Sequence, residues 1–453
     1  MKPTQIAALI GASVMLLAAD APEIRAVLMY ASDVVAQPGA SVALRVGVRA
    51  DTDGRPVAGE TVEYLLREVD GRELAEPVPI GAAQSDGAGR ATHVWNPSAG
   101  AWADVGRFDI VARLAAGSRY AAQARIEVFV ASADRPLLLL KLDADTRKSS
   151  DRPTASPAKP AVSGSKVLEK LGGTYQFVYL SAVELRAAPA FKAWIERRRL
   201  PAGPLLLLED DDDAQRSDEE RAAKRIAELV HAHPRTAIGI GATAADARAF
   251  ANNGLPAIVV PQDLKGVGKL PPDALATTNW TTVYAHARLC EMSEELLRTF
   301  DRGGAEAIEA RTYLEKLGRP GVACLDRLRD EPQLRPAAIY VSGLLRGGID
   351  GFGDALDWST ADALRDSLLA AWRFGEASVV RRLYADPRAA GADPLPTYER
   401  WEALDDGREL DGSSVVYAIR LTAADGTSSV KDITCVRQLD STWRVGGVTA
   451  PPD

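Results

Sequence analysis

Between residues 23 and 132 the chain alternates apolar and polar side chains over short segments. Ser41–Val48 and Ala124–Val130 both follow the two-residue period of a strand that buries one face. Turn signals such as Asp53-Gly54 and Asp86-Gly87 separate these segments. Many short strands joined by regular turns predict an all-β sandwich over this region.

From residue 134 short apolar runs alternate with segments of helical periodicity. The main apolar runs are Leu137–Leu142, Gln176–Leu180 and Thr236–Ile240. The segments with helical spacing are Lys166–Leu171, Phe191–Arg199, Asp218–His231 and Ala244–Ala251. Strands that alternate with helices usually pair in parallel, so we predict a Rossmann-like α/β domain over residues 134–270. Such a sheet binds its ligand at the carboxyl ends of its strands.

The last part of the chain has two further patterns. Residues 271–355 carry apolar stripes at helical spacing and predict a helical connector. Residues 356–453 begin with a long amphipathic segment, Ser359–Tyr384, which predicts one helix. The strand candidates that follow are Ser413–Leu421, Ser428–Gln438 and Thr442–Val448. We therefore expect a multidomain protein that ends in an α+β domain.

Length and charge narrow the classes of function. The 453 residues suffice for about three domains of ordinary size. The formal net charge of −8 argues against a nucleic-acid-binding protein, which needs clustered Lys and Arg. It also argues against electrostatic docking on anionic membranes.

Residues 1–21 are typical of an export signal. Lys2 supplies a charged start, Ile6–Ala19 a short apolar core, and Ala19-Asp20-Ala21 the small residues of a cleavage site. Pro22 follows that site and is unfavourable for cleavage, so an uncleaved membrane anchor is the alternative. We expect a periplasmic or envelope-associated protein.

The three cysteines are widely spaced and exclude a Cys-x-x-Cys zinc or redox motif. Cys435 lies in an alternating stretch and predicts a core strand residue. Cys290 and Cys324 are compatible with a disulfide formed after export or with two buried thiols.

Candidate chemistry begins where the first apolar run of the middle domain ends. Asp143 and Asp145 follow Leu137–Leu142 directly, and a carboxylate at a strand end can act as a nucleophile or as an acid/base group. The alternative is that Asp-x-Asp only ends the strand in a turn.

Three later residues have the chemistry to complete a phosphoryl-transfer site. Ser181 ends the second apolar run, and its hydroxyl is either a phosphate donor or a helix N-cap. Lys224 could neutralise phosphate or lie on a solvated helix face, with Arg221 and Arg225 as competitors. Asp246 follows the strand Thr236–Ile240 and is either a magnesium ligand or a first-turn helix acid.

The stretches around these residues, in this order, resemble the haloacid-dehalogenase superfamily. Leu142–Thr146, Tyr179–Ala182 and Gly239–Ala247 are the matching segments, and they are closest to the lipin-type and actin-patch phosphatidate phosphatases. The resemblance implies Asp143 as nucleophile and Asp145 as acid/base residue. It implies Ser181 and Lys224 as phosphate holders, and Asp143, Asp145 and Asp246 around Mg2+.

Two positions depart from that pattern. Ala242 stands where many members have an acidic residue, although lipin-type members also lack one there. Lys141 places a charge inside a normally apolar strand, where it either snorkels at a sheet edge or sits next to the site.

The flanking regions have resemblances of their own. Pro56–Val62 and Ser85–Ala91 are similar to bacterial immunoglobulin-like domains, in which His93 and Trp95 would be strand side chains. The element order of 356–453 resembles the nuclear-transport-factor-2-like cone fold.

These observations predict an exported Mg2+-dependent phosphatase that acts through an aspartyl-phosphate on a phosphatidate-like lipid or another small organic phosphate. The alternatives are a binding protein that keeps the fold without catalysis and an envelope structural protein.

Overall fold

The computed structural model describes residues 26–51, 53–97, 106–132, 135–142, 162–181, 188–207, 217–261, 263–303, 305–374, 377–390, 396 and 398–450. The chain separates into two compact units. The first unit is Met1–Asp134 together with Val183–Arg197 and Gly203–Glu209, and the second is Arg135–Ala182, Arg198–Ala202 and Asp210–Asp453. Two short segments of the middle region therefore belong with the N-terminal sheets.

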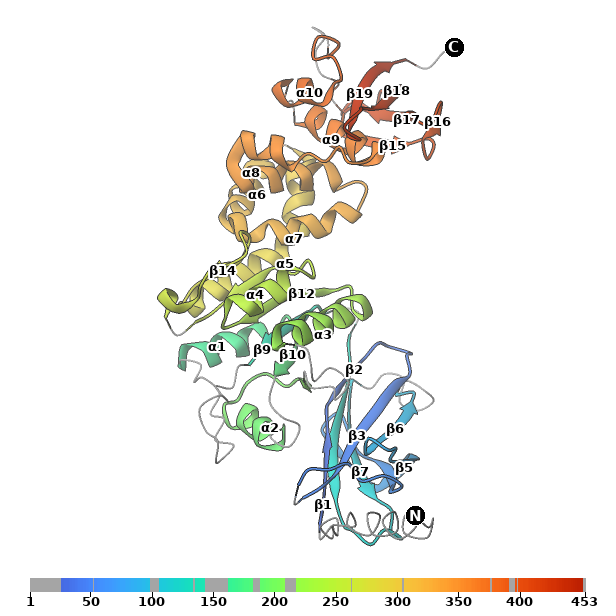
Figure 1. Cartoon of the computed structure of the whole chain (residues 1–453). Coiled ribbons are helices and arrows are strands. Elements are labelled where there is room, and N and C mark those ends of the chain that lie inside the picture. The colour runs from blue at the N-terminus through green and yellow to red at the C-terminus, as the bar shows by residue number, and fades with distance from the viewer. Residues whose placement is uncertain are drawn as a thin grey trace, which may run out of the picture. The chain divides into compact units, whose positions relative to one another are not determined.

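The first unit contains two sheets, one ordered β1-β3-β6 and the other β2-β8-β7-β4-β5. Their strands are β1 Val27–Ala31, β2 Val34–Ala36, β3 Val42–Ala50, β4 Thr61–Val69, β5 Arg72–Gln84, β6 Arg90–Trp95, β7 Arg107–Leu114 and β8 Gln123–Val130. Within these sheets the described strands pair antiparallel, except that β2 pairs in parallel with β8. The predicted β-sandwich is confirmed (Figure 1).

The apolar side chains of the alternating segments fill the space between these sheets. Leu44, Tyr64 and Phe108 are fully buried, because every second residue of a strand points to the same face. His93 and Trp95 lie in β6 as expected, and Trp95 packs edge-on against Phe108 at a ring distance of 5.0 Å.

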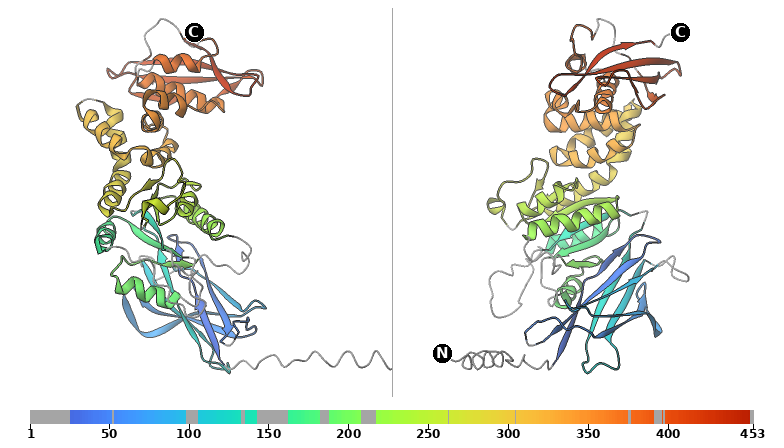
Figure 2. Two further views of the ribbon diagram at one scale, coloured as in Figure 1. Left: turned by 60° about the vertical axis from the view of Figure 1, so that its left-hand side comes forward. Right: turned by 45° about the vertical axis from the view of Figure 1, so that its right-hand side comes forward.

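A helix and a short strand from the middle region complete the first unit. They are α2, Ala188–Arg197, and β11, Leu205–Leu207. Phe191 and Trp194 are buried on the inner side of α2, and Figure 2 shows this helix beside the strands.

The second unit begins with a parallel sheet in which neighbouring strands run in the order β10-β9-β12-β13-β14. Its strands are β9 Leu137–Lys141, β10 Gln176–Ser181, β12 Thr236–Gly241, β13 Ala257–Val259 and β14 Leu275–Ala276. Its helices are α1 Val162–Leu171, α3 Asp218–Ala232 and α4 Ala244–Ala251. The predicted parallel α/β arrangement is confirmed, whereas the haloacid-dehalogenase assignment stays a prediction.

Helices pack in two pairs around this sheet. Helix α3 packs against α4, α1 packs against α5 (Trp280–Arg302), and β12 contacts both α4 and α5. Gly239 of β12 admits this packing, because a Cβ atom there would lie 2.2 Å from the ring of Phe250 on α4.

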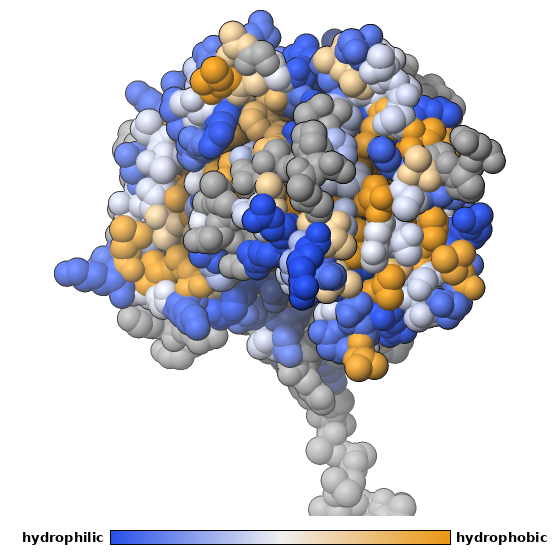
Figure 3. All heavy atoms as spheres, turned by 90° about the horizontal axis from the view of Figure 1, so that it is seen from above, coloured by the Kyte–Doolittle hydropathy of each residue, from blue (hydrophilic) through white to orange (hydrophobic). Residues whose placement is uncertain are grey.

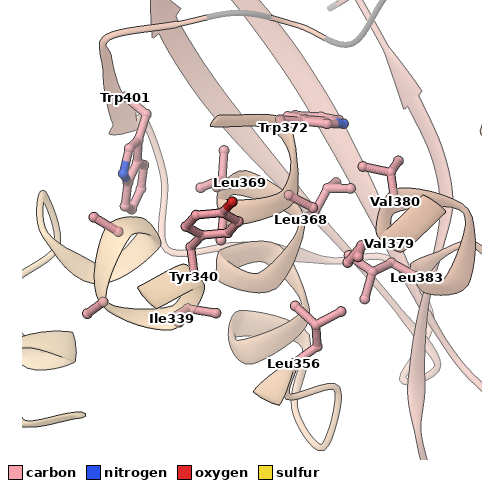
Figure 4. Packing of buried hydrophobic residues seen from close by; sticks show 14 of the residues in the cluster. Ile339, Tyr340, Leu356, Leu368, Leu369, Trp372, Val379, Val380, Leu383 and Trp401 are labelled. Carbon is pink, nitrogen blue, oxygen red and sulfur yellow. The ribbon is translucent and has the colours of Figure 1, made fainter. Parts of the chain in front are cut away.

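The helices that follow share one apolar core with the C-terminal sheet. They are α6 Ala305–Leu317, α7 Val322–Asp326, α8 Arg335–Ala355, α9 Ala361–Arg373 and α10 Ala377–Leu383, with 3-10 turns at Leu264–Gly266, Arg319–Gly321 and Arg327–Asp330. Figure 4 shows Tyr340 of α8 near Leu368 and Leu369 of α9, among other buried apolar side chains of this core.

The single helix predicted over Ser359–Tyr384 is wrong, since α9 and α10 are two helices. Phe374 ends α9 because its backbone, at φ −103° and ψ 7°, leaves the helical range.

The C-terminal sheet is antiparallel and has the strands β15 Arg400–Ala403, β16 Arg408–Glu409, β17 Ser414–Thr422, β18 Ser428–Arg437 and β19 Trp443–Thr449. The three predicted strands are confirmed, and the cone-like assignment stays a prediction.

Large exposed hydrophobic side chains are distributed over different elements. Val94, Ile308, Leu410 and Leu439 are all more than half exposed, and the face in Figure 3 carries small hydrophobic groups among hydrophilic ones. Single exposed hydrophobic residues are ordinary in folded proteins. Among the described residues, no helix is long and apolar enough to cross a membrane.

Candidate functional site

The parallel sheet has a topological switch point at β9. Strand β9 pairs with β10 on one side and with β12 on the other, so the chain leaves β9 in one direction and later returns to its opposite edge. In open α/β sheets, ligands bind outside the carboxyl ends of the strands at such a point. Lys141 ends β9, Ser181 ends β10 and Gly241 ends β12. Of the predicted site residues, Ser181 and Asp246, which follows β12, come at this carboxyl edge of the sheet.

Ser181 has a structural partner at this edge. Its side chain is fully buried, and its Oγ donates to the carbonyl oxygen of Leu142 at 3.3 Å. The backbone N–H of Leu142 in turn donates to the carbonyl of Leu180 at 2.9 Å. The hydroxyl therefore extends the contact between the ends of β9 and β10, and its role as a phosphate donor stays a prediction.

Asp246 is tied to Lys141 and to its own helix N-terminus. The Nζ atom of Lys141 contacts Oδ1 of Asp246, and the two side chains are 7% and 0% exposed. The backbone N–H groups of Ala242 and Thr243 both donate to Oδ2 at 3.0 Å. Thr243 accepts the N–H of Asp246 at 3.2 Å, which completes a capping box at the start of α4.

Gly241 is required by this arrangement. A Cβ atom at Gly241 would lie 2.4 Å from the Cβ of Asp246, closer than real side chains approach. The first turn of α4 therefore packs directly on the end of β12. Of the two possibilities for Lys141, the structure shows the one beside the site, and the pairing with Asp246 was not foreseen.

Lys224 lies on the exposed face of α3. On the same helix, Glu219 forms a two-pronged ion pair with Arg248 of α4 at 2.8 and 3.0 Å. The hydrogen bond from Arg248 lowers the pKa of Glu219. The negative charge of Asp246 opposes this change, and the positive charge of Lys141 adds to it. The sequence offered no signal for Glu219, because its partner is on another helix.

The predicted catalytic carboxylates, Asp143 and Asp145, lie outside the described residues. The same holds for the predicted export segment, residues 1–21. Their roles stay predictions from the sequence.

A divalent cation can be tested against the remaining predicted ligand, Asp246. Mg2+ needs negatively charged or neutral oxygen ligands at ~2.0–2.1 Å. One oxygen of Asp246 holds the Lys141 ammonium and the other accepts two N–H groups, so both are occupied. An ammonium on the same carboxylate also repels a second cation. Asp246 in this arrangement does not fit a magnesium ligand.

A second buried charge cluster lies in the first unit. Asp33 is 1% exposed and contacts the ammonium of Lys192 on α2. Its carboxylate also accepts the backbone N–H groups of Glu127, at 2.7 Å, and of Leu205, at 2.8 Å. Burial, together with the nearby Glu127 carboxylate, raises the pKa of Asp33 against the opposing effect of Lys192.

A cleft of about 430 Å³ opens near this cluster, and we refer to it as the sandwich cleft. It lies between α2 and the strands β1, β4, β7 and β8. The polar residues that line it are Tyr30, Arg67, Gln123, Arg125, Lys192 and Glu196. Its charged lining is three cationic side chains and one acidic side chain, and each cation is also paired with an acid outside the lining. The volume of the cleft is that of an ordinary small-molecule site.

The cysteines resolve the alternatives that the sequence left open. Cys290 and Cys324 form a disulfide with a Cα–Cα distance of 5.5 Å. Cys435 is a buried free thiol in β18, as predicted, and burial raises its pKa to about 12.

No protein-family model matches this chain, and no curated protein matches it. Among solved structures it is similar to a bacterial immunoglobulin-like domain from the M. primoryensis ice-binding adhesin, with 18% identity over 23% of this chain and 93% of that chain and a TM-score of 0.14. It is also similar to a Paenibacillus sp. cycloisomaltooligosaccharide glucanotransferase, with 10% identity over 65% and 43% of the two chains and a TM-score of 0.20. A 2,6-sialyltransferase from a Vibrionaceae Photobacterium species matches with 10% identity over 75% and 63% of the two chains and a TM-score of 0.16. At these TM-scores the similarities carry no argument about function.

Proposed function

We propose that this chain is an exported binding protein whose haloacid-dehalogenase-like α/β domain is not catalytic. Its ligand is a small organic anion held in the sandwich cleft. The proposal rests on the contacts of Asp246 and on the lining of that cleft.

The contacts of Asp246 support this proposal over metal-dependent catalysis. A buried ammonium and two backbone amides use both oxygens of the only predicted metal ligand that the structure describes. Burying both charges costs desolvation energy, which good geometry and extra hydrogen bonds offset. Lys141 thus supplies internally the positive charge that a metal would otherwise bring to Asp246.

The lining of the sandwich cleft supports an anionic ligand. Arg125 and Lys192 are each held by an acid that does not line the cleft, Asp109 at 2.6 Å and the buried Asp33. Fixed cations in a partly enclosed site favour carboxylate or phosphate groups, since Arg presents several N–H donors in one plane.

The disulfide supports export. Cys290–Cys324 is a bond of the kind that forms and persists in oxidising compartments. The signal-like residues 1–21 predict the same localisation from the sequence.

The second candidate is the phosphatase. Asp143 and Asp145 follow β9 in the sequence, and β9 forms the switch point at which ligands of such sheets bind. Ser181 and Asp246 also lie at this edge of the sheet. No step through Mg2+ is assigned, because Asp246 does not fit that ion.

Turnover of an aryl phosphate separates the two candidates. Wild type and Asp143→Asn are assayed with p-nitrophenyl phosphate, with added Mg2+ and with a chelator. The binding-protein proposal predicts the same background rate for both proteins in both conditions. Turnover by wild type that Asp143→Asn abolishes would overturn it in favour of the phosphatase.

Calorimetry with phenyl phosphate and benzoate tests the cleft. We expect binding of at least one of these anions and a loss of about fivefold or more in Arg67→Gln, whose side chain lines the cleft. Arg113→Gln is the matched control: its surface ion pair with Glu63 resembles that of Arg67 with Glu73, but it does not line the cleft. Absence of binding, or equal losses in both variants, would refute the ligand assignment.

A further inference from the structure

Three potential metal ligands meet between helices α5 and α7. His286 and Cys290 lie one helical turn apart on α5, and Cys324 lies on α7. One ligand atom from each residue lies within 4.8 Å of the others. The cluster shares no residue with the sandwich cleft or with the strand-end site, and the proposed function uses its disulfide only as support for export.

The cluster is largely buried from solvent. His286 and Cys324 are each 6% exposed, while Cys290 is half-buried and gives access from the surface. The hydroxyl of Ser293 donates to the carbonyl of Cys290 at 2.7 Å, which fixes this part of α5.

The chemistry of the three side chains matches zinc. Zn2+ is bound by thiolate sulfur at ~2.3 Å and by imidazole nitrogen at ~2.0–2.1 Å in tetrahedral geometry. Two thiolates neutralise the dication, so the occupied site would bury no net charge. The fourth position would be left to water, as in three-ligand zinc sites.

The distances between the three ligand atoms need only one change to suit tetrahedral zinc. Tetrahedral zinc places neighbouring ligand atoms about 3.5–3.8 Å apart, from the same bond lengths. Nε2 of His286 already lies 3.7 Å from Sγ of Cys290. The two sulfurs are bonded to each other, so the site is available only after the disulfide opens.

We propose that His286, Cys290 and Cys324 form a redox-gated zinc site, closed as the disulfide and opened by a dithiol reductant. A thiolate of the reductant attacks one sulfur, the Cys290–Cys324 bond breaks, and the second thiol of the reductant closes its own disulfide. The chain receives two electrons and two protons and now carries two thiols. Binding of Zn2+ then releases the two thiol protons to solvent.

Cobalt titration of the full chain tests the site. Co2+ replaces zinc in such sites and gives thiolate-to-cobalt absorption, which reports sulfur ligands directly. Oxidised protein, and protein reduced with a dithiol that is then removed without air, are titrated side by side. Circular dichroism of the same samples reports whether the helices persist.

We expect one Co2+ per reduced chain, with thiolate absorption that Zn2+ displaces, and no such signal from oxidised chain. Cys290→Ser/Cys324→Ser should abolish the signal, and His286→Ala should weaken binding by at least about tenfold, the least that even an outer-shell partner contributes. Cys435→Ala is the matched control, because Cys435 is a free buried thiol away from the cluster, and it should behave as wild type.

Three results would overturn the proposal. The first is a reduced wild type that binds no Co2+, including one that loses its helical signal and does not regain it with metal. The second is binding that survives the double cysteine substitution. The third is binding lost equally in Cys435→Ala.

Discussion

Each unit contains a buried Lys–Asp pair, and the two pairs are built differently. Asp246 takes its backbone donors from Ala242 and Thr243, four and three residues away. Asp33 takes its donors from Glu127 and Leu205, 94 and 172 positions away. The first carboxylate organises one helix turn, whereas the second joins segments that are distant in the chain. Both carboxylates hold a distant lysine, but the backbone hydrogen bonds are local capping in one unit and long-range assembly in the other.

The largest expected effect comes from Asp246→Ala. It leaves the Lys141 ammonium buried without this carboxylate and removes the acceptor of two N–H groups. Breaking a buried pair from one side costs about 3–5 kcal/mol of unfolding free energy. Urea unfolding of the full chain measures it.

A double substitution checks the cause. Lys141→Met/Asp246→Asn removes both charges and keeps an oxygen that can accept the backbone N–H groups, so most of the lost stability should return. A double variant as unstable as Asp246→Ala would show that packing, and not the buried charge that lost Asp246, sets the loss.

Asp33→Ala should cost less, about 2–3 kcal/mol, because the backbone N–H groups of Glu127 and Leu205 lose their acceptor and a charge-assisted bond is lost. The reason for the difference is Lys192, whose side chain is 18% exposed and can turn its ammonium to water.

Hydrogen exchange of the backbone amides shows which segments each carboxylate stabilises. In Asp33→Ala we expect faster exchange in α2 and β11, whereas in Asp246→Ala it should rise mainly at the start of α4. Equal patterns in the two variants would contradict the local-versus-distant distinction.

The pH dependence of stability should differ with and without Asp33. A carboxyl whose pKa is raised on folding binds more protons in the folded state than in the unfolded state between its ordinary pKa of 3.8 and its raised value. Its contribution to stability is therefore lost as pH rises through the folded pKa and returns as pH falls toward 3.8. Wild type should gain stability relative to Asp33→Asn as the pH is lowered in that window, measured by urea unfolding at several pH values. A relative loss would show that the buried carboxyl has a lowered pKa.

The smallest expected effect is that of Thr243→Ala, about 1 kcal/mol for loss of an N-cap. Ser217→Ala is a matched control, since Ser217 caps α3 with the same capping box. Thermal unfolding should show a slightly larger loss for Thr243, because its cap also orients the carboxylate that holds Lys141. A larger loss for Ser217 would separate the cap from the ion pair.

Much of the fold could be predicted because its signals are local. Helix α4, for example, begins and ends at the predicted residues Ala244 and Ala251. The prediction over Ser359–Tyr384 was wrong because two amphipathic helices with nearly continuous apolar stripes resemble one. The break at Phe374 changes the backbone without changing the periodicity.

The sequence by itself determined the alternating strands of the first unit, the α/β alternation of the second and the polar residues at the strand ends. These follow from side-chain period, turn chemistry and caps, which act over a few residues. Only the tertiary structure decided that Lys141 pairs with Asp246, that Asp33 pairs with Lys192, and that Cys290 bonds Cys324. Those contacts join residues 105, 159 and 34 positions apart, and their energy depends on burial that no local pattern specifies.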